Sequence, residues 1–258
     1  MIQLTEVKRT GDNAILKEAT NLRKNNGRFS YESEFNTNGE GVAFTTNNTE
    51  IFKVIENYTP HLKEDPNFFK IVTGTNESVE FYNNMVRDIL GYETPVPQEG
   101  EMVMGYDNWG GVYDRLLRKT VYKIINSEDY VVTKVGETQT KTVRLTMNRY
   151  DFDAPSVQIT YTPVTLKDSN GRTVTVPYTL YEQNAQALSD IADMIQELNL
   201  KKAQAARSKE KAALRSYLEM INALKGEVMC DRDVLDKYGN TILKKAVDFG
   251  YAITAYKS

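Results

Sequence analysis

The stretch DFGYAITAYKS, residues 248–258, indicates the fold class of this protein. Residues 251–255 form a short run of apolar and β-branched residues, which is typical of a buried strand. Thr254, Tyr256 and Lys257 place hydrogen-bond donors at the end of that run. Because ligands of open α/β sheets bind beyond the carboxyl ends of the strands, we expect these donors to meet a phosphate group or a nucleic acid.

Composition limits the possible functions. A chain of 258 residues is long enough for one large or two modest domains, and its net charge of -3 gives no global attraction to nucleic acid. The single cysteine, Cys230, excludes an internal disulfide framework and a multi-cysteine zinc site, and no metal site is expected. The single histidine, His61, is expected to be an ordinary surface side chain. The sequence has no signal peptide and no long apolar run, so we expect a soluble cytoplasmic protein without membrane contact.

The first 95 residues are typical of an α/β domain. Residues 4–9 predict a strand that ends in a loop before a helix, which places Arg9 where a guanidinium group can meet a phosphate or simply face solvent. Residues 68–73 predict a buried strand, followed by a helix from 77 to a stop at Gly91. Thr75 and Asn76 at the start of that helix can act as an N-cap or hold a phosphate on the exposed amides.

The middle of the chain has a different composition. Residues 94–100 form a proline-rich connector, which predicts a domain boundary, and the short strand-like runs after it predict a small β-barrel with a hairpin turn at 168–171. The region 182–226 predicts two antiparallel helices or one broken helix. Its second half is locally basic, which indicates either a solvated face or a surface that tracks a nucleic acid. Trp109 is expected in a surface loop. The strand-like runs are 101–106, 121–125, 130–135, 142–148, 156–161 and 172–178.

Four segments resemble motifs of one family, the RecD-like, Dda-type group of superfamily-one DNA helicases. Residues 4–9, LTEVKR, are similar to the motif whose arginine reaches the γ-phosphate of ATP. Residues 75–76, followed by Asn83 or Asn84 and then Arg87, are similar to a DNA-contacting segment. Residues 125–132 resemble the signature of an SH3-like inserted domain. Residues 251–258 resemble a further motif, with Tyr256 in the place of a histidine.

The resemblance implies a partial RecA-like α/β domain with an inserted small all-β SH3-like barrel and a helical hairpin. The implied segments are 1–95 and 240–258 for the RecA-like domain, 96–181 for the barrel, and 182–239 for the helical limb and its connection. It also implies binding of single-stranded DNA in an enzyme that moves 5′-to-3′. The implied catalytic residue is Arg9, and the implied DNA-binding residues are Thr75, Asn76, Arg87, Thr254, Tyr256 and Lys257.

The sequence lacks the phosphate-binding parts of such a motor. It has no Gly-Lys dipeptide for a phosphate loop and no Asp-Glu dipeptide for magnesium and water. We therefore expect ATP and magnesium to bind only in a complete protein that adds a first motor domain before Met1 and continues beyond Ser258. The chain alone is expected to hydrolyse no ATP. The alternative hypothesis is a non-enzymatic adaptor that binds a protein partner through the barrel or the helical limb.

Overall fold

The computed structural model describes residues 14–24, 27, 33–35, 41–114, 116, 118–146, 153–236 and 238–254. The chain forms two compact units, Met1–Asn57 and Tyr58–Ser258, and the fold is mixed α/β, as predicted. Among the described residues, no helix is both long and apolar enough to cross a membrane. The segment boundaries predicted at residues 95, 181 and 239 remain predictions.

The first unit contains short elements. Helix α1 (Ala14–Lys24) is followed by an antiparallel pair of strands, β1 (Glu34–Phe35) and β2 (Gly41–Val42), and then by α2 (Asn48–Tyr58). Asn47 caps the start of α2, because its side-chain oxygen accepts a hydrogen bond from the Thr49 amide at 3.0 Å. Helix α1 follows the segment 4–9, as the sequence predicted. Arg9 lies outside the described residues.

The second unit begins with a strand-loop-helix arrangement that the end of the chain completes. A short 3-10 helix, η1 (Thr59–Lys63), leads to β3 (Ile71–Thr73) and α3 (Asn76–Leu90), and β3 pairs in parallel with β15 (Ala252–Thr254). Helix α3 ends at Gly91, whose φ of 82° is the left-handed conformation that glycine adopts at little cost. The prediction of a buried strand from residue 68 was wrong, because β3 is shorter and Val72 is 57% exposed.

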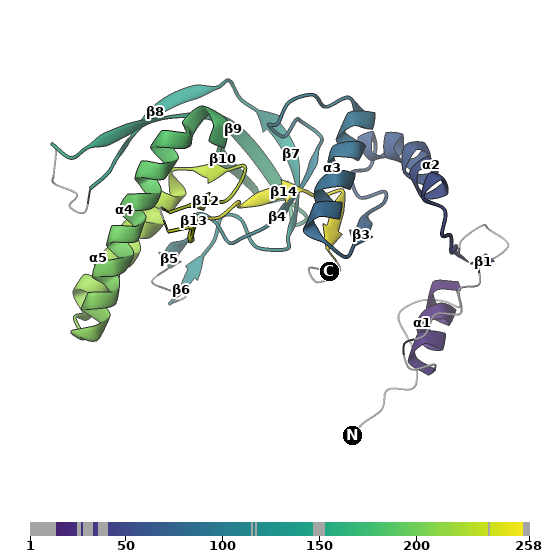
Figure 1. The fold of residues 1–258 in the computed structure, drawn as a ribbon, viewed down its shortest axis with the longest axis horizontal. Helices are drawn as coiled ribbons and strands as arrows, with labels where there is room; N and C mark the ends of the chain where they lie inside the picture. Colours follow the sequence, from purple (N-terminus) through teal and green to yellow (C-terminus); the bar gives the residue numbers. More distant parts are fainter. Residues whose placement is uncertain are drawn as a thin grey trace. The chain divides into compact units, whose positions relative to one another are not determined.

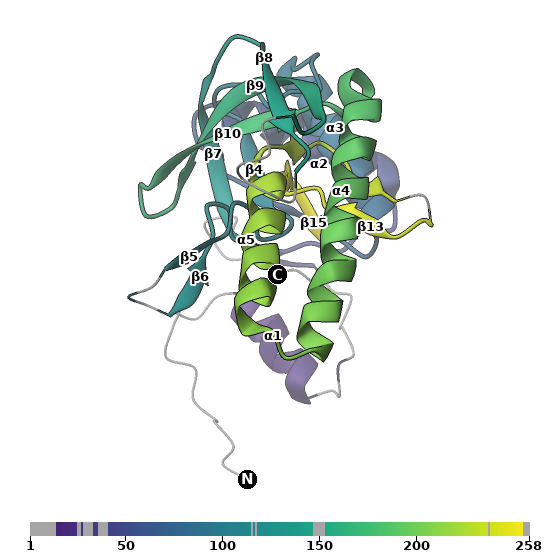
Figure 2. The ribbon, with the colours of Figure 1, turned by 90° about the vertical axis from the view of Figure 1, so that its left-hand side faces the viewer.

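A curled open sheet forms the largest part of the second unit (Figures 1 and 2). Its path is β11-β10-β9-β7-β4-β14, and β8 pairs with β9 beside it. Only the β10–β11 pair is parallel. The strands are β4 (Met102–Gly105), β7 (Asp129–Val135), β8 (Gln139–Arg144), β9 (Ser156–Asp168), β10 (Thr173–Thr179), β11 (Met229–Cys230) and β14 (Val247–Phe249).

Strands β7 and β8 run along β9 one after the other. Val135 pairs with Val164 and Gln139 with Tyr161, so the two strands together form one long ribbon with β9. The sequence predicted this strand only to residue 161. The alternation of apolar and polar residues continues to 168, but it includes Pro163, and proline is unusual inside a strand. The predicted turn at 168–171 is confirmed, since the Asp168 carboxylate accepts hydrogen bonds from the amides of Asn170 and Arg172.

Two long helices cover one side of the ribbon. Helices α4 (Tyr181–Arg207) and α5 (Lys211–Gly226) are separate, which settles the predicted alternative in favour of two helices. They share a core with β8, β9 and the small pair β12 (Val234–Leu235) and β13 (Thr241–Leu243). Leu188, Ile191 and Ile195 of α4 have no exposed surface in this core. Burial of this apolar stripe therefore fixes the helices on the sheet.

A second core lies inside the curl of the sheet and contains the only tryptophan. Trp109 is 7% exposed, and its indole N–H donates to the carbonyls of Lys225 and Val228, at 3.0 and 2.8 Å. The expectation of a surface loop was therefore wrong. The neighbouring glycines suggested an open loop, but in the structure they permit close packing before the hairpin of β5 (Val112–Asp114) and β6 (Lys119–Val121).

Candidate nucleic-acid interface

Two of the segments predicted to bind nucleic acid meet at one edge of the β3–β15 sheet. Thr73 and Thr254 are paired residues at the carboxyl ends of the two parallel strands, and α3 begins three residues after Thr73. Thr75 and Asn76 are exposed, whereas Thr254 is 8% exposed. Ligands of α/β sheets bind at the carboxyl ends of the strands, and this edge also lies directly beside a helix N-terminus.

The N-terminus of α3 is organised by Thr75. Its hydroxyl accepts a hydrogen bond from the Ser78 amide at 3.2 Å, and its carbonyl accepts one from the Thr73 hydroxyl at 3.0 Å. Thr75 is therefore an N-cap, which is one of the two predicted roles. The amides of Asn76 and Glu77 belong to the first turn, where no intrahelical acceptor is available, so they can donate to an anion. The Glu77 carboxylate interacts favourably with the helix dipole, but it repels such an anion.

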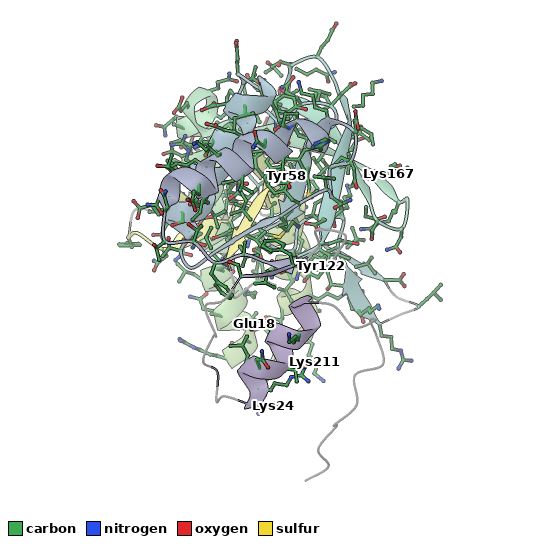
Figure 3. All side chains as sticks on the ribbon, turned by 90° about the vertical axis from the view of Figure 1, so that its right-hand side faces the viewer. Glu18, Lys24, Tyr58, Tyr122, Lys167 and Lys211 are labelled. Carbon is green, nitrogen blue, oxygen red and sulfur yellow. The ribbon has the colours of Figure 1, made fainter. Side chains whose placement is uncertain are left out.

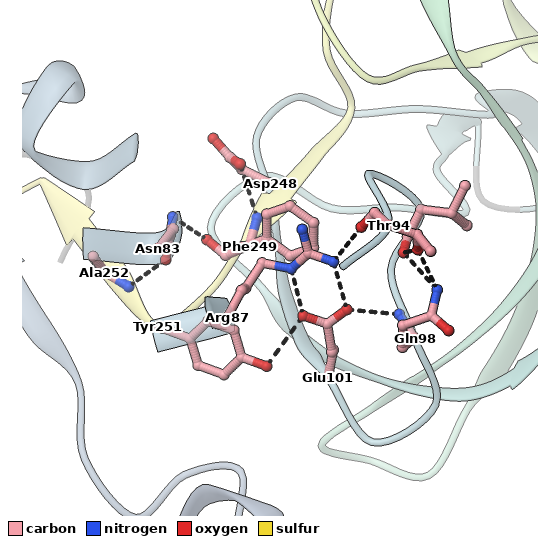
Figure 4. A network of polar contacts seen from close by, with 10 residues as sticks. Asn83, Arg87, Thr94, Gln98, Glu101, Asp248, Phe249, Tyr251 and Ala252 are labelled. Carbon is pink, nitrogen blue, oxygen red and sulfur yellow. Dashed lines mark hydrogen bonds and ion pairs between the residues drawn. The ribbon is translucent and has the colours of Figure 1, made fainter. Parts of the chain in front are cut away.

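Asn83 holds β15 against α3. Its side chain is 1% exposed, and it donates to the Phe249 carbonyl and accepts from the Ala252 amide, both at 2.8 Å (Figure 4). These two bonds span the turn between β14 and β15. Asn83 therefore positions the strand that carries Thr254, whereas its neighbour Asn84 is exposed.

Arg87 takes part in a buried ion pair one turn of helix further on. Its Nε lies 2.8 Å from Glu101 Oε1, and its Nη2 lies 3.2 Å from Glu101 Oε2 and 2.6 Å from the Thr94 carbonyl (Figure 4). The guanidinium carbon also lies 3.9 Å from the centre of the Phe249 ring. Arg87 thus links α3 to the residue directly before β4 of the curled sheet. This engagement leaves Arg87 7% exposed and gives it a role in packing, and its contact with DNA stays a prediction.

Glu101 collects further donors around this ion pair. The Gln98 amide donates to its carboxylate at 2.7 Å, and the Tyr251 hydroxyl donates at 3.4 Å. Burial, together with the negative charge of Glu101, raises the pKa of Tyr251 far above its usual range, so this hydroxyl remains a donor. Sequence reasoning did not identify Glu101 as important. The available signal was one carboxylate directly before the apolar run of residues 102–104, where a charge needs a partner.

The remaining predictions concern residues other than those at this edge. Arg9, Tyr256 and Lys257 lie outside the described residues. His61 is exposed, as expected, and its ring lies 4.8 Å from the ring of Phe68, beside Tyr58, which Figure 3 labels. In the described part of the chain, no cluster of three or more histidine, cysteine and acidic side chains could hold a metal ion.

Comparison with known proteins identifies no family for this chain. The sequence matches no protein-family model, and it matches no curated protein.

Proposed function

We propose that this chain is part of a RecD-like, Dda-type DNA helicase, and that the β3–β15 edge contacts single-stranded DNA. The parallel pairing of Thr73 with Thr254 is the observation that carries the proposal. It brings together two segments far apart in the chain, each of which resembles a motif of the same family. If the two short matches were accidental, there would be no reason for the two segments to lie at the same sheet edge.

The position of the curled sheet is a second support. All of its strands, together with α4 and α5, lie in the sequence between α3 and β15, while β15 returns to pair with β3. This connectivity fits an inserted domain, and we propose that the curled sheet is the SH3-like barrel and that β3, α3 and β15 are part of a RecA-like domain. In a complete cytoplasmic enzyme, a first motor domain would supply the sites for ATP and magnesium, and Arg9 would reach the γ-phosphate.

The DNA contact can be tested by adding a negative charge at the α3 N-terminus. The unmodified chain should bind a fluorescent oligothymidylate with a Kd on the order of 10⁻⁴ to 10⁻⁶ M, weakening as salt is added. Asn76→Asp places a carboxylate at the helix N-terminus. There its interaction with the helix dipole stabilises the helix by about 0.3–1 kcal/mol, but its charge repels a phosphate. One unit charge about 4 Å from another in water contributes about 1 kcal/mol, so binding should weaken about fivefold.

The matched control is Asn170→Asp, which makes the same change at an exposed position in the turn between β9 and β10, outside the β3–β15 edge. Fluorescence anisotropy should give this control the affinity of the unmodified chain. Thermal unfolding should show that Asn76→Asp is at least as stable as the unmodified chain, which separates a lost contact from a damaged fold. Equal affinities for the two variants would remove the α3 N-terminus from the DNA contact.

A further inference from the structure

A groove separates α5 from the β5–β6 hairpin, and we call it the α5 groove. In both ribbon views the hairpin lies beside the helix (Figures 1 and 2). The groove has a volume of about 680 Å³, which falls within the range of about 300–1,000 Å³ for ligand pockets. Val112, Tyr113 and Lys123 line its sheet side, and Lys211, Arg215 and Leu218 line its helix side.

The walls of the α5 groove expose apolar side chains that a folded chain normally covers. Val112 is 63% exposed, Tyr113 47% and Leu218 41%, and the three residues belong to the two facing elements. These three side chains offer apolar contacts to a ligand in the groove. Tyrosine and arginine are also the residues that most often dominate binding energy in protein interfaces. Tyr113 supplies such a ring, with the guanidinium carbon of Arg215 5.5 Å from its centre.

The charges around the α5 groove favour an acidic occupant. Its two carboxylates already have partners: Glu219 lies 3.2 Å from Arg215, and Glu227 lies 2.7 Å from Lys141. Across the described part of the chain, no ion pair joins Lys123 or Lys211 to a carboxylate. The groove therefore offers two ammonium groups beside an apolar surface.

A protein segment fits this arrangement better than a nucleic acid does. A surface that tracks a phosphate backbone needs a row of cations, and the exposed basic residues near the tip of the helical hairpin, Lys201, Arg207 and Lys209, do not line the groove.

We propose that the α5 groove binds a short acidic segment of a partner protein. The apolar side chains of this segment pack between Val112 and Leu218, and its carboxylates meet Lys123 and Lys211. The proposal does not depend on the helicase assignment, because no residue of α3, β3 or β15 lines the groove. It gives the adaptor hypothesis a defined surface, and a helicase can use the same surface to recruit a partner.

Peptide selection followed by binding measurements tests this proposal. A random library of short displayed peptides is selected against the whole chain, and the recovered sequences should combine acidic and apolar residues. Isothermal titration with a synthetic selected peptide should show about a tenfold loss of affinity for the variant Lys123→Glu with Lys211→Glu, because like charges then face each other. The matched control, Lys201→Glu with Lys209→Glu, changes the same charge outside the groove and should bind like the unmodified chain.

Two results would overturn the proposal. The first is a selection that recovers no acidic and apolar peptides, or peptides that bind both double variants equally. The second is binding of oligothymidylate that the Lys123 and Lys211 variant loses and the control keeps, which would assign the groove to a nucleic acid. A Leu218→Asn variant gives an independent check, because it should weaken peptide binding by removing apolar surface without changing any charge in the groove. Its thermal unfolding midpoint verifies that the fold is intact.

Discussion

Replacing Glu101 by glutamine tests the buried link between α3 and the curled sheet. Glu101 has no exposed surface, and its carboxylate accepts hydrogen bonds from Arg87, the Gln98 amide and the Tyr251 hydroxyl. The substitution keeps the shape of the side chain but removes its charge. The Arg87 guanidinium then remains buried without an anionic partner, and one of its hydrogen bonds meets an amide group that is itself a donor.

The expected cost is large compared with that of an ordinary surface change. Removing one partner of a buried ion pair destabilises a protein by about 3–5 kcal/mol. An exposed pair provides the comparison: Arg215 and Glu219 are joined at 3.2 Å with side chains 54% and 48% exposed. Such a pair on a helix contributes about 0.3–0.5 kcal/mol, so Glu219→Gln should cost no more than this.

Urea unfolding followed by the fluorescence of Trp109 measures both variants. This residue is the only tryptophan, and it lies in the core of the curled sheet. With a slope of about 1–3 kcal/mol per molar urea, the Glu101→Gln midpoint should fall by more than about 1 M. The Glu219→Gln midpoint should move by less than about 0.5 M.

A double variant separates the charge from the packing. Arg87→Met together with Glu101→Gln leaves no buried charge at this position, so it should be more stable than Glu101→Gln alone. If Glu101→Gln instead unfolds at the same urea concentration as Glu219→Gln, the buried pair does not hold α3 to the sheet. If the double variant is the least stable of the series, an uncompensated arginine charge is not the cause of the loss.

Two further predictions concern buried polar groups near the end of the chain. Asn83→Ala leaves the Phe249 carbonyl and the Ala252 amide without their 2.8 Å partners, so it should cost about 2–4 kcal/mol and speed hydrogen exchange at the Ala252 amide; unchanged exchange there would contradict this role. Burial raises the pKa of the Cys230 thiol from 9.0 to about 12, so the native protein at pH 8 should react with a thiol reagent only as fast as it unfolds. Because the pKa of this thiol is higher in the folded than in the unfolded protein, Cys230 contributes stability below pH 9 that is lost as the pH rises towards 12. The urea midpoint should therefore decline over this pH range, and it should decline less in Cys230→Ala.

The sequence by itself determined the elements whose ends have local chemical causes. Helix α3 begins and ends close to the predicted positions, because an N-capping threonine and a left-handed glycine act within one turn of the helix. The turn between β9 and β10 was predicted for the same reason, since Asp168 bonds to amides within four residues of itself. The strand at the end of the chain was predicted from its apolar run and occurs at Ala252–Thr254.

Only the tertiary structure decided the roles that depend on distant partners. The partners of Trp109 are carbonyls more than a hundred residues later in the chain, so its glycine-rich surroundings gave no signal of burial. The resemblance pointed to Arg87 as a DNA contact, but only the tertiary structure shows that Glu101 pairs with it and makes it a packing residue. Thr254 lies beside Thr73 because a parallel pair needs no closeness in sequence, and its long crossover connection leaves no local pattern that shows which strands will pair.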